Sequence, residues 1–253
     1  MLQSNNSSKD SILSVENLTV SFDGYKVVDG LSLSIEEKEL RVIIGPNGAG
    51  KTTLLDLISG RTRPTEGTMK FRGIDLKNKA EHEIVQLGLG RKFQTPSIFE
   101  DLTVFENLEI SFPRGRGVFG AFFFKRDSEV EDRVNEVARV IFLDNLLDQP
   151  AAALSHGQKQ WLEIGMLLIQ DPSLMMLDEP VAGMTLNERE KTAELLNKII
   201  EGRSVVVIEH DMNFVRKIAR WVTVMHQGKV LSEGLMADVQ KDPQVIEVYL
   251  GHS

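Results

Sequence analysis

The chain has 253 residues, of which 42% are apolar and 26% charged, a balance typical of a globular protein with a sizeable buried core. Its formal net charge of −8 argues against a nucleic-acid partner, and the absence of cysteine excludes disulfides and thiolate metal sites. The sequence contains neither an apolar run long enough to cross a bilayer nor the apolar core of a signal peptide, so we expect a cytosolic protein that meets a membrane only through a partner.

The chain is expected to begin with a tail and a hairpin. Residues 1–11 are polar and rich in Ser and Asn, which predicts a disordered tail. Apolar and polar residues alternate over 12–20 and again over 27–35, which predicts two antiparallel strands joined by a turn. Phe22 and Tyr25 lie at this turn, so either ring could stack on a planar base or could instead pack in the core or at the sheet edge.

A glycine-rich loop at 45–52 follows an apolar run and precedes a helical pattern, the setting that the phosphate-binding pattern G-x-x-x-x-G-K-[ST] requires. Glycines let successive N–H groups point at one anion, and the following helix adds the positive end of its dipole. Lys51 is expected to neutralise the outer phosphates and Thr52 to hold a magnesium ion. The alternative is a glycine-rich turn with a solvated lysine. The residues expected to bind ATP here are Gly45, Pro46, Asn47, Gly48, Ala49, Gly50, Lys51, Thr52 and Thr53.

Short elements follow the loop and its helix. The patterns predict a strand at 68–71, a short helix at 81–87, and a further strand that runs to Gln94 and is stopped by Pro96. At a strand end the Gln94 side chain could reach a metal ion or a water molecule, although a surface position is the alternative.

A helical region is predicted over 103–142, with a basic Pro/Gly loop at 113–117 as an interruption. The run 118–124 is the most apolar short piece of the chain and includes Phe122 and Phe123. Because basic residues flank this run, it could face an apolar partner. The alternative is a subdomain core, since clustered aromatic side chains are usually buried within their own chain.

A long helix is predicted to begin near Ser155, with Gln158 at the spacing of a capping box. A helix N-terminus that carries Ser155 and Gly157 at its tip can bind an anion. A well-capped helix without any ligand gives the same pattern.

Polar residues follow two apolar strands in the second half of the chain. The apolar strand predicted from Ser173 ends in the adjacent acids Asp178 and Glu179, and His210 follows the strand at 204–208. Such strands suit the centre of a parallel sheet, where ligands bind beyond the carboxyl ends. We therefore expect these side chains to emerge beside the phosphate loop; solvated acids and a structural histidine are the alternatives. A helix over 186–201, a hairpin over 221–231 and short helices over 236–250 complete the chain.

Taken together, the motifs resemble those of the nucleotide-binding subunit of an ATP-binding cassette (ABC) transporter, over about residues 12–250. The matching positions are 45–52 for the Walker A loop, Gln94 for the Q-loop, 154–158 for the signature, 174–179 for the Walker B strand and His210 for the switch histidine. The resemblance implies an α/β P-loop NTPase core with a mixed sheet, an antiparallel β subdomain and an inserted α-helical subdomain at about 95–165, within one domain of 12–253.

The resemblance also implies ATP and Mg²⁺ as ligands and a role for each matching residue. Thr52, Gln94 and Asp178 would position the magnesium ion directly or through water, and Gln94 would also serve catalysis. Glu179 would orient and polarise the attacking water, and His210 would contact the γ-phosphate.

In the family, two such subunits pack head to tail, so Ser155 and Gly157 would close over ATP bound to the other protomer. Three positions depart from the commonest family pattern. Phe22 replaces the base-stacking tyrosine, His156 replaces a signature glycine, and Thr185 stands where an aspartate is usual, which puts in doubt how the two sites communicate.

A finer resemblance rests on the stretches 91–99, 154–163, 179–185 and 245–251, which look like the urea-transporter ATP-binding subunit of the branched-chain amino acid and amide importer group. It implies an ATPase that serves a bacterial importer at the cytoplasmic face of the inner membrane. Its partners would be two integral-membrane permease subunits, a second ATP-binding subunit and, indirectly, a periplasmic binding protein. Urea is the expected solute, and a branched-chain amino acid is the alternative. Both stay open because the ATPase never touches the substrate, so its residues do not identify it.

Two other classes of protein compete with this interpretation. A soluble ABC ATPase of translation would normally carry two cassettes, and one of DNA repair would carry a long coiled coil; the sequence has neither. A regulatory ATP-binding module without turnover is disfavoured because Lys51, Asp178, Glu179 and His210 are all present. The segment at 95–124 is expected to receive the permease.

Overall fold

The computed structural model describes residues 11–92, 97–113 and 128–250 and contains two sheets. The predictions for Gln94, for the apolar run at 118–124 and for the tail at 1–10 fall outside these residues. In the described ranges, no helix combines the length and the apolar character needed to cross a membrane.

The first sheet is antiparallel and has the strand order β2-β1-β4-β5. Its strands are β1 (Ser11–Phe22), β2 (Tyr25–Glu36), β4 (Glu66–Phe71) and β5 (Ile74–Asp75). The predicted hairpin is confirmed, since Phe22 pairs with Tyr25 across the tight turn. Ser11 belongs to the strand and not to the tail.

The second sheet has the order β10-β9-β3-β8-β7-β6, and every neighbouring pair except β9 and β10 is parallel. Its strands are β3 (Leu40–Ile44), β6 (Leu89–Lys92), β7 (Leu174–Asp178), β8 (Ser204–Ile208), β9 (Trp221–His226) and β10 (Lys229–Leu235). The parallel strands therefore end at one edge of the sheet, where ligand sites of such sheets occur.

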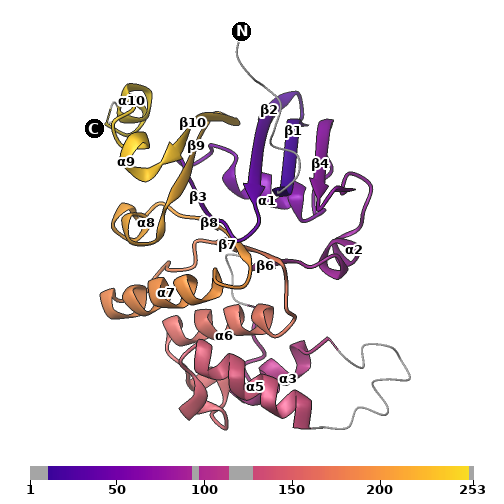
Figure 1. The fold of residues 1–253 in the computed structure, drawn as a ribbon, viewed down its shortest axis with the longest axis vertical. Coiled ribbons are helices and arrows are strands. Elements are labelled where there is room, and N and C mark those ends of the chain that lie inside the picture. The colour runs from indigo at the N-terminus through magenta and orange to yellow at the C-terminus, as the bar shows by residue number, and fades with distance from the viewer. Residues whose placement is uncertain (1–10, 93–96, 114–127, 251–253) are drawn as a thin grey trace.

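Helices cover the second sheet and form a separate group at one end of the molecule. They are α1 (Lys51–Ile58), α2 (Glu81–Gln86), α3 (Val104–Ser111), α5 (Ser128–Val140), α6 (His156–Leu168), α7 (Leu186–Ile199), α8 (Met212–Ile218), α9 (Met236–Val239) and α10 (Pro243–Leu250), with short 3₁₀ turns at Asp144–Leu146 and Ala151–Ala153. Figure 1 shows α3, α5 and α6 together at the end remote from the antiparallel sheet.

Strand β7 shows how the two faces of the parallel sheet are buried. Met175 and Leu177 belong to the core formed with the helices α3, α5, α6, α7 and α8, whereas Leu174 and Met176 belong to the core formed with α1 and the antiparallel sheet. Because side chains alternate along a strand, a continuous apolar run is what two covered faces require. The prediction of a central, doubly covered strand is confirmed.

Candidate functional site

The glycine-rich loop joins the buried strand β3 to α1. A side chain at Gly45 would bring its Cβ within 2.3 Å of the Met225 carbonyl oxygen, and one at Gly50 within 2.7 Å of the Val27 carbonyl oxygen. Gly50 is also the N-cap residue of α1, which has no side-chain cap. Gly50 therefore leaves the first amide groups of α1 without a side-chain cap from the N-cap position, which is the arrangement that binds an anion at a helix N-terminus.

Lys51 lies inside the loop and is only 9% exposed, so the alternative of a solvated lysine is wrong. Its ammonium group donates hydrogen bonds to the carbonyl oxygens of Gly45 (2.8 Å) and Pro46 (3.0 Å). Burial lowers the pKa of Lys51, and the nearby Glu179 and Asp178 carboxylates oppose this shift. The loop therefore holds a desolvated cation, which can interact strongly with a phosphate.

Asp178, at the carboxyl end of β7, lies beside the loop. Asp178 is 2% exposed, and its carboxyl group lies near the Thr52 hydroxyl. Burial raises the pKa of Asp178, while Arg91 and the Thr52 hydroxyl oppose the shift. A buried carboxylate and a hydroxyl are hard oxygen ligands of the kind that Mg²⁺ prefers together with substrate phosphates. In the described ranges no group of three or more His, Cys, Asp or Glu residues could hold a metal, so this pair fits an ion shared with a phosphate and not an all-protein cage.

Glu179 and His210 meet at the same edge of the sheet. The His210 Nδ1 atom lies 3.2 Å from the Glu179 Oε1 atom, and the Glu179 backbone N–H donates to the Ile208 carbonyl oxygen at 3.0 Å. Glu179 itself has a φ of 46°, an uncommon conformation for a residue that is not glycine. The structure thus brings together Lys51, Asp178, Glu179 and His210, as the strand ends predict.

Sequence reasoning missed Glu209, which is 1% exposed. Its carboxylate accepts backbone N–H groups of Val181 (3.3 Å), His210 (3.1 Å) and Asp211 (3.3 Å), so it joins the loop after Glu179 to the loop that carries His210. Burial raises the pKa of Glu209 against these three hydrogen bonds. The sequence did contain a signal for Glu209, namely an acidic residue placed between an apolar strand and His210.

Arg189 makes a second connection between these two loops. Its side chain donates to the Met184 carbonyl oxygen at 3.1 Å and forms an ion pair with Asp211, which caps α8. This link could not be read from the sequence, because Arg189 and Asp211 lie on different elements.

The turn between β1 and β2 exposes both aromatic side chains. Phe22 is 48% and Tyr25 71% exposed, so neither ring packs in the core. The start of β2 also lies against the phosphate loop, since the Val27 carbonyl oxygen closely approaches Gly50. Either ring is therefore available to a nucleotide base.

The capping box at the start of α6 is confirmed. The Ser155 hydroxyl accepts from the Gln158 backbone N–H at 3.2 Å, and the Gln158 side chain accepts from the Ser155 N–H at 2.8 Å. The Ser155 side chain also contacts Glu188 of α7. In the described part of the chain, none of the Ser155 hydrogen bonds reaches the phosphate loop.

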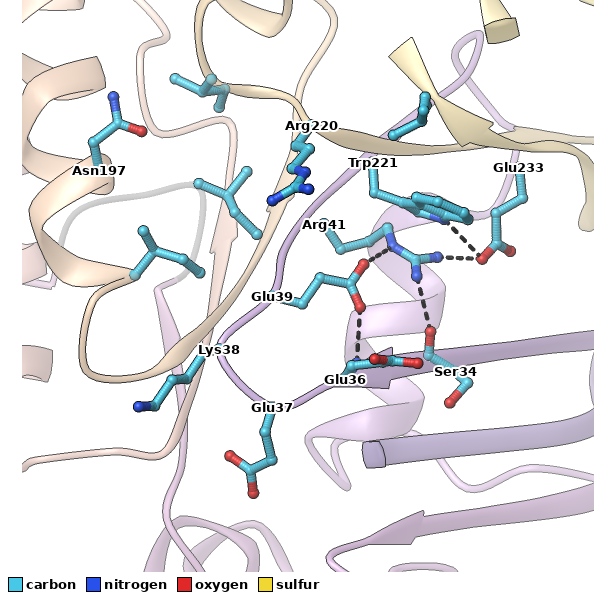
Figure 2. Close-up of a pocket in the computed structure, with 14 residues that line it drawn as sticks. Ser34, Glu36, Glu37, Lys38, Glu39, Arg41, Asn197, Arg220, Trp221 and Glu233 are labelled. Atoms are coloured by element: carbon cyan, nitrogen blue, oxygen red, sulfur yellow. Dashed lines mark hydrogen bonds and ion pairs between the residues drawn. The ribbon is translucent and has the colours of Figure 1, made fainter. Parts of the chain in front are cut away.

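A pocket of about 760 Å³ lies elsewhere in the described structure. It opens at the amino ends of β3 and β9, the edge of the sheet opposite to the phosphate loop. Figure 2 shows the residues that line it. Arg41 donates there to the Thr223 hydroxyl (2.9 Å) and the Ser34 carbonyl oxygen (3.0 Å) and forms ion pairs with Glu39 and Glu233. The Trp221 ring lies beside the guanidinium. Because these groups satisfy one another, we interpret the cluster as structural.

Replacing Arg41 by Ala should lower the free energy of unfolding by about 2–4 kcal/mol, because it leaves Glu39 and Glu233 without their shared cation. The matched control is Arg72→Ala, which removes an exposed ion pair to Glu37 and should cost less than about 1 kcal/mol. Urea unfolding of both variants measures the difference. Equal losses would show that the Arg41 cluster does not stabilise the fold.

Comparison with known proteins decides the family. A family model described as "ABC transporter" matches residues 28–182, which include the loop, the signature and both acids. The chain belongs to the ABC transporter family. A second model, "Branched-chain amino acid ATP-binding cassette transporter", matches residues 229–253 of this cassette.

Relatives and solved structures match most of the chain. A probable branched-chain amino acid transport ATP-binding protein LivG of Archaeoglobus fulgidus is 36% identical, with 95% of each chain covered. The crystal structure of the ADP conformation of an ATP-binding cassette of an ABC transporter has a TM-score of 0.83, 32% identity and coverage of 95% and 99%. A dimeric cassette in a post-hydrolysis state, bound to ADP and Pi, has a TM-score of 0.73, 26% identity and coverage of 88% and 98%. The predicted ABC ATPase fold is confirmed, and the cassette is an ATPase.

Asp178→Asn should raise the melting temperature of the nucleotide-free cassette at pH 7, because it removes the cost of a buried charge. In a chain of this size the rise should be about 2–4 °C for each kcal/mol of that cost. The folded-state pKa of Asp178 is raised by burial, so the folded state bears the cost of the charge above that pKa. As the pH falls through the folded-state pKa, the folded state takes up a proton before the unfolded state does, and the wild type gains stability. The advantage of the variant should therefore shrink towards pH 4 in thermal scans. A variant less stable than the wild type at pH 7 would contradict the argument.

Proposed function

We propose that this cassette is the ATP-hydrolysing subunit of an ABC importer that drives the uptake of branched-chain amino acids. The observation that carries the proposal is the convergence of a phosphate loop, two acids and a histidine at one sheet edge, in a chain similar along its length to LivG-type proteins. The match of the last 25 residues, 229–253, to the branched-chain amino acid cassette model supports the choice of solute.

The phosphate loop is proposed to hold the ATP phosphates. The amide groups at the start of α1 would donate to phosphate oxygens, and the Lys51 ammonium would leave the Gly45 and Pro46 carbonyl oxygens for the outer phosphates. The exposed Phe22 or Tyr25 ring would stack on the adenine.

Thr52 and Asp178 are the described residues that would hold Mg²⁺, with Gln94 as a further proposed ligand. The ion would neutralise charge on the phosphates. Asp178 suits this task because its buried carboxylate lies near the Thr52 hydroxyl and would gain a strong partner in a cation.

Glu179 and His210 are proposed to act on the attacking water and the γ-phosphate. The Glu179 carboxylate would accept a proton from the water and align it for in-line attack. The His210 ring, held by its Nδ1 contact to Glu179, would present its other nitrogen to the γ-phosphate. Catalysis then consists of positioning and charge stabilisation.

A second ATP-binding subunit is proposed to complete the site. Ser155 and Gly157 would close over ATP held by the partner protomer, which gives the capped start of α6 a ligand. Leu186, the first residue of α7, is 79% exposed, which suits a surface that a second protomer covers. The dimeric ADP-bound cassette supports such an assembly.

The cassette is proposed to bind two integral-membrane permease subunits at the cytoplasmic face of the inner membrane, with a periplasmic binding protein as an indirect partner. Phe99 and Ile110 are exposed on the segment expected to receive the permease, at 95–124. Large apolar side chains of this kind favour a protein interface.

Urea is the second candidate solute. The stretches 91–99, 154–163 and 179–185 look like the urea-transporter subunit, including His156 in the signature and Thr185 after it. The names of the relatives favour branched-chain amino acids instead.

The test is uptake of labelled leucine and labelled urea by a strain that lacks this chain, with the wild-type chain and the Glu179→Gln variant returned on a plasmid. We expect loss of leucine uptake, rescued by the wild type alone. Loss of urea uptake only would establish the second candidate, and loss of neither would reject both solutes.

A further inference from the structure

Glu188, in the first turn of α7, joins the signature to the loop that follows Glu179. Its Oε1 atom accepts a hydrogen bond from the Ser155 hydroxyl at 3.0 Å. Its Oε2 atom accepts from the backbone N–H and the hydroxyl of Thr185, each at 2.9 Å. The two carboxylate oxygens therefore serve two different loops.

The same carboxylate lies directly over Gly157. A Cβ atom at Gly157 would come within 2.4 Å of the Glu188 carboxyl carbon and Oε1 atom. An anion therefore already occupies the space next to the start of α6, where the positive end of the helix dipole lies. The hydrogen bonds from Thr185, and then that from Ser155, lower the pKa of Glu188 and keep it ionised at neutral pH.

Capping of α7 does not require the contact with Ser155. The capping box uses the Thr185 hydroxyl, which accepts from the Glu188 N–H at 3.3 Å, and only one of the two Glu188 side-chain oxygens. The other oxygen is directed to a residue 33 positions earlier in the chain.

Two departures from the commonest family pattern reinforce this contact. Thr185 supplies a hydroxyl donor to Glu188, where an aspartate would place a second carboxylate beside it. The His156 Nε2 atom lies 3.0 Å from the Ala182 carbonyl oxygen, and the ring packs against Gly183 in the same loop. Residues of the signature are thus connected to the loop 181–185 at two points.

We propose that Glu188 is a positioning residue that competes with the partner's ATP for the signature. A serine hydroxyl has one hydrogen, so Ser155 can donate to Glu188 or to a phosphate but not fully to both. The carboxylate also repels a phosphate that approaches Gly157. Dimer closure would therefore have to displace Glu188, which raises the nucleotide concentration needed for closure. This inference rests on the proposed composite site.

The variant Glu188→Gln separates this role from capping. Glutamine also forms capping boxes and has nearly the same volume, but it removes the charge and leaves the Ser155 hydroxyl free to donate to a phosphate. Glu190→Gln is the matched control, because it removes the same charge from the same helix at an exposed pair with Lys217.

The measurement is sedimentation of each protein at a fixed protomer concentration across a titration of a non-hydrolysable ATP analogue with Mg²⁺. We expect Glu188→Gln to lower the analogue concentration for half-maximal dimer about three- to tenfold, and Glu190→Gln to leave it unchanged. In ATPase assays, KM should fall in Glu188→Gln while kcat stays within about twofold.

Glu188→Ala serves as a second variant, since it removes the competing anion together with the side-chain half of the capping box that Glu188 supplies. If Glu188 had a merely structural role, this variant would need a higher analogue concentration for half-maximal dimer. If Glu188 competes with ATP, the variant needs a lower one. An unchanged or raised midpoint in Glu188→Gln, with a wild type that does dimerise, would overturn the role of Glu188 alone. A wild type that stays monomeric at every analogue concentration would overturn the composite site as well.

Discussion

Glu179→Gln is expected to slow ATP hydrolysis by at least about 100-fold while leaving ATP affinity within about twofold. The amide keeps the size of the side chain and can still contact His210, but it cannot accept a proton from the attacking water. The Glu179 carboxylate is the group that lies between the phosphate loop and His210. Steady-state phosphate release and equilibrium binding of a fluorescent ATP analogue measure the two quantities separately.

The exposed Glu201 provides the control for Glu179, since Glu201→Gln removes the same charge away from the sheet edge and should leave the hydrolysis rate unchanged. Turnover near the wild-type rate in Glu179→Gln would remove Glu179 from the catalytic assignment. Loss of ATP binding in that variant would instead assign Glu179 to the binding of the nucleotide.

Lys51→Ala is expected to weaken ATP binding at least about 100-fold, a larger effect on affinity than that expected of Glu179→Gln. The ammonium group is buried within the loop, so its attraction to a phosphate is weakly screened by water. The loss of ATP affinity in Lys51→Ala should far exceed that in Lys217→Ala, since Lys217 is an exposed lysine paired with Glu190. Equilibrium binding of ATP to Lys51→Ala and Lys217→Ala makes the comparison.

The folded state of Lys51→Ala should be retained, because burial lowers the pKa of Lys51 and its removal relieves a desolvated charge. Circular dichroism and thermal unfolding check this point. A folded Lys51→Ala protein that binds ATP as the wild type does would show that the loop is not the nucleotide site.

Local spacing made much of the fold predictable from the sequence. The hairpin at Phe22 and Tyr25 and the capping box of Ser155 and Gln158 involve residues three apart, so they could be read directly. The position of Glu179 followed from the general rule that ligands bind beyond the carboxyl ends of parallel strands.

Long-range contacts could not be read in the same way. Glu188 reaches Ser155 across 33 positions, and Glu209 reaches Val181 across 28, so both pairs depend on how α6, β7 and β8 pack. Local spacing explains Thr185 and Glu188 only as a capping box, whereas the tertiary contact connects them to the signature. The Arg41 cluster was missed for the same reason.

The solute shows a different limit of sequence reasoning. Urea was expected from the resemblance of short stretches, whereas relatives that match 95–96% of the chain are named branched-chain amino acid transport ATP-binding proteins, the stated alternative. In the proposed assembly the cassette contacts ATP and its partner subunits but not the solute. No side chain described above therefore has a chemical reason to differ between the two solutes.

The most direct test of the composite site is the ATPase rate per protomer, measured from well below to well above the concentration at which the cassette dimerises with ATP. If Ser155 and Gly157 complete the site of a second protomer, the rate per protomer should rise with concentration and then level off, and Ser155→Arg should abolish the rise while ATP binding persists. A rate per protomer that stays constant over this range, in a protein that sediments as a monomer, would contradict the account.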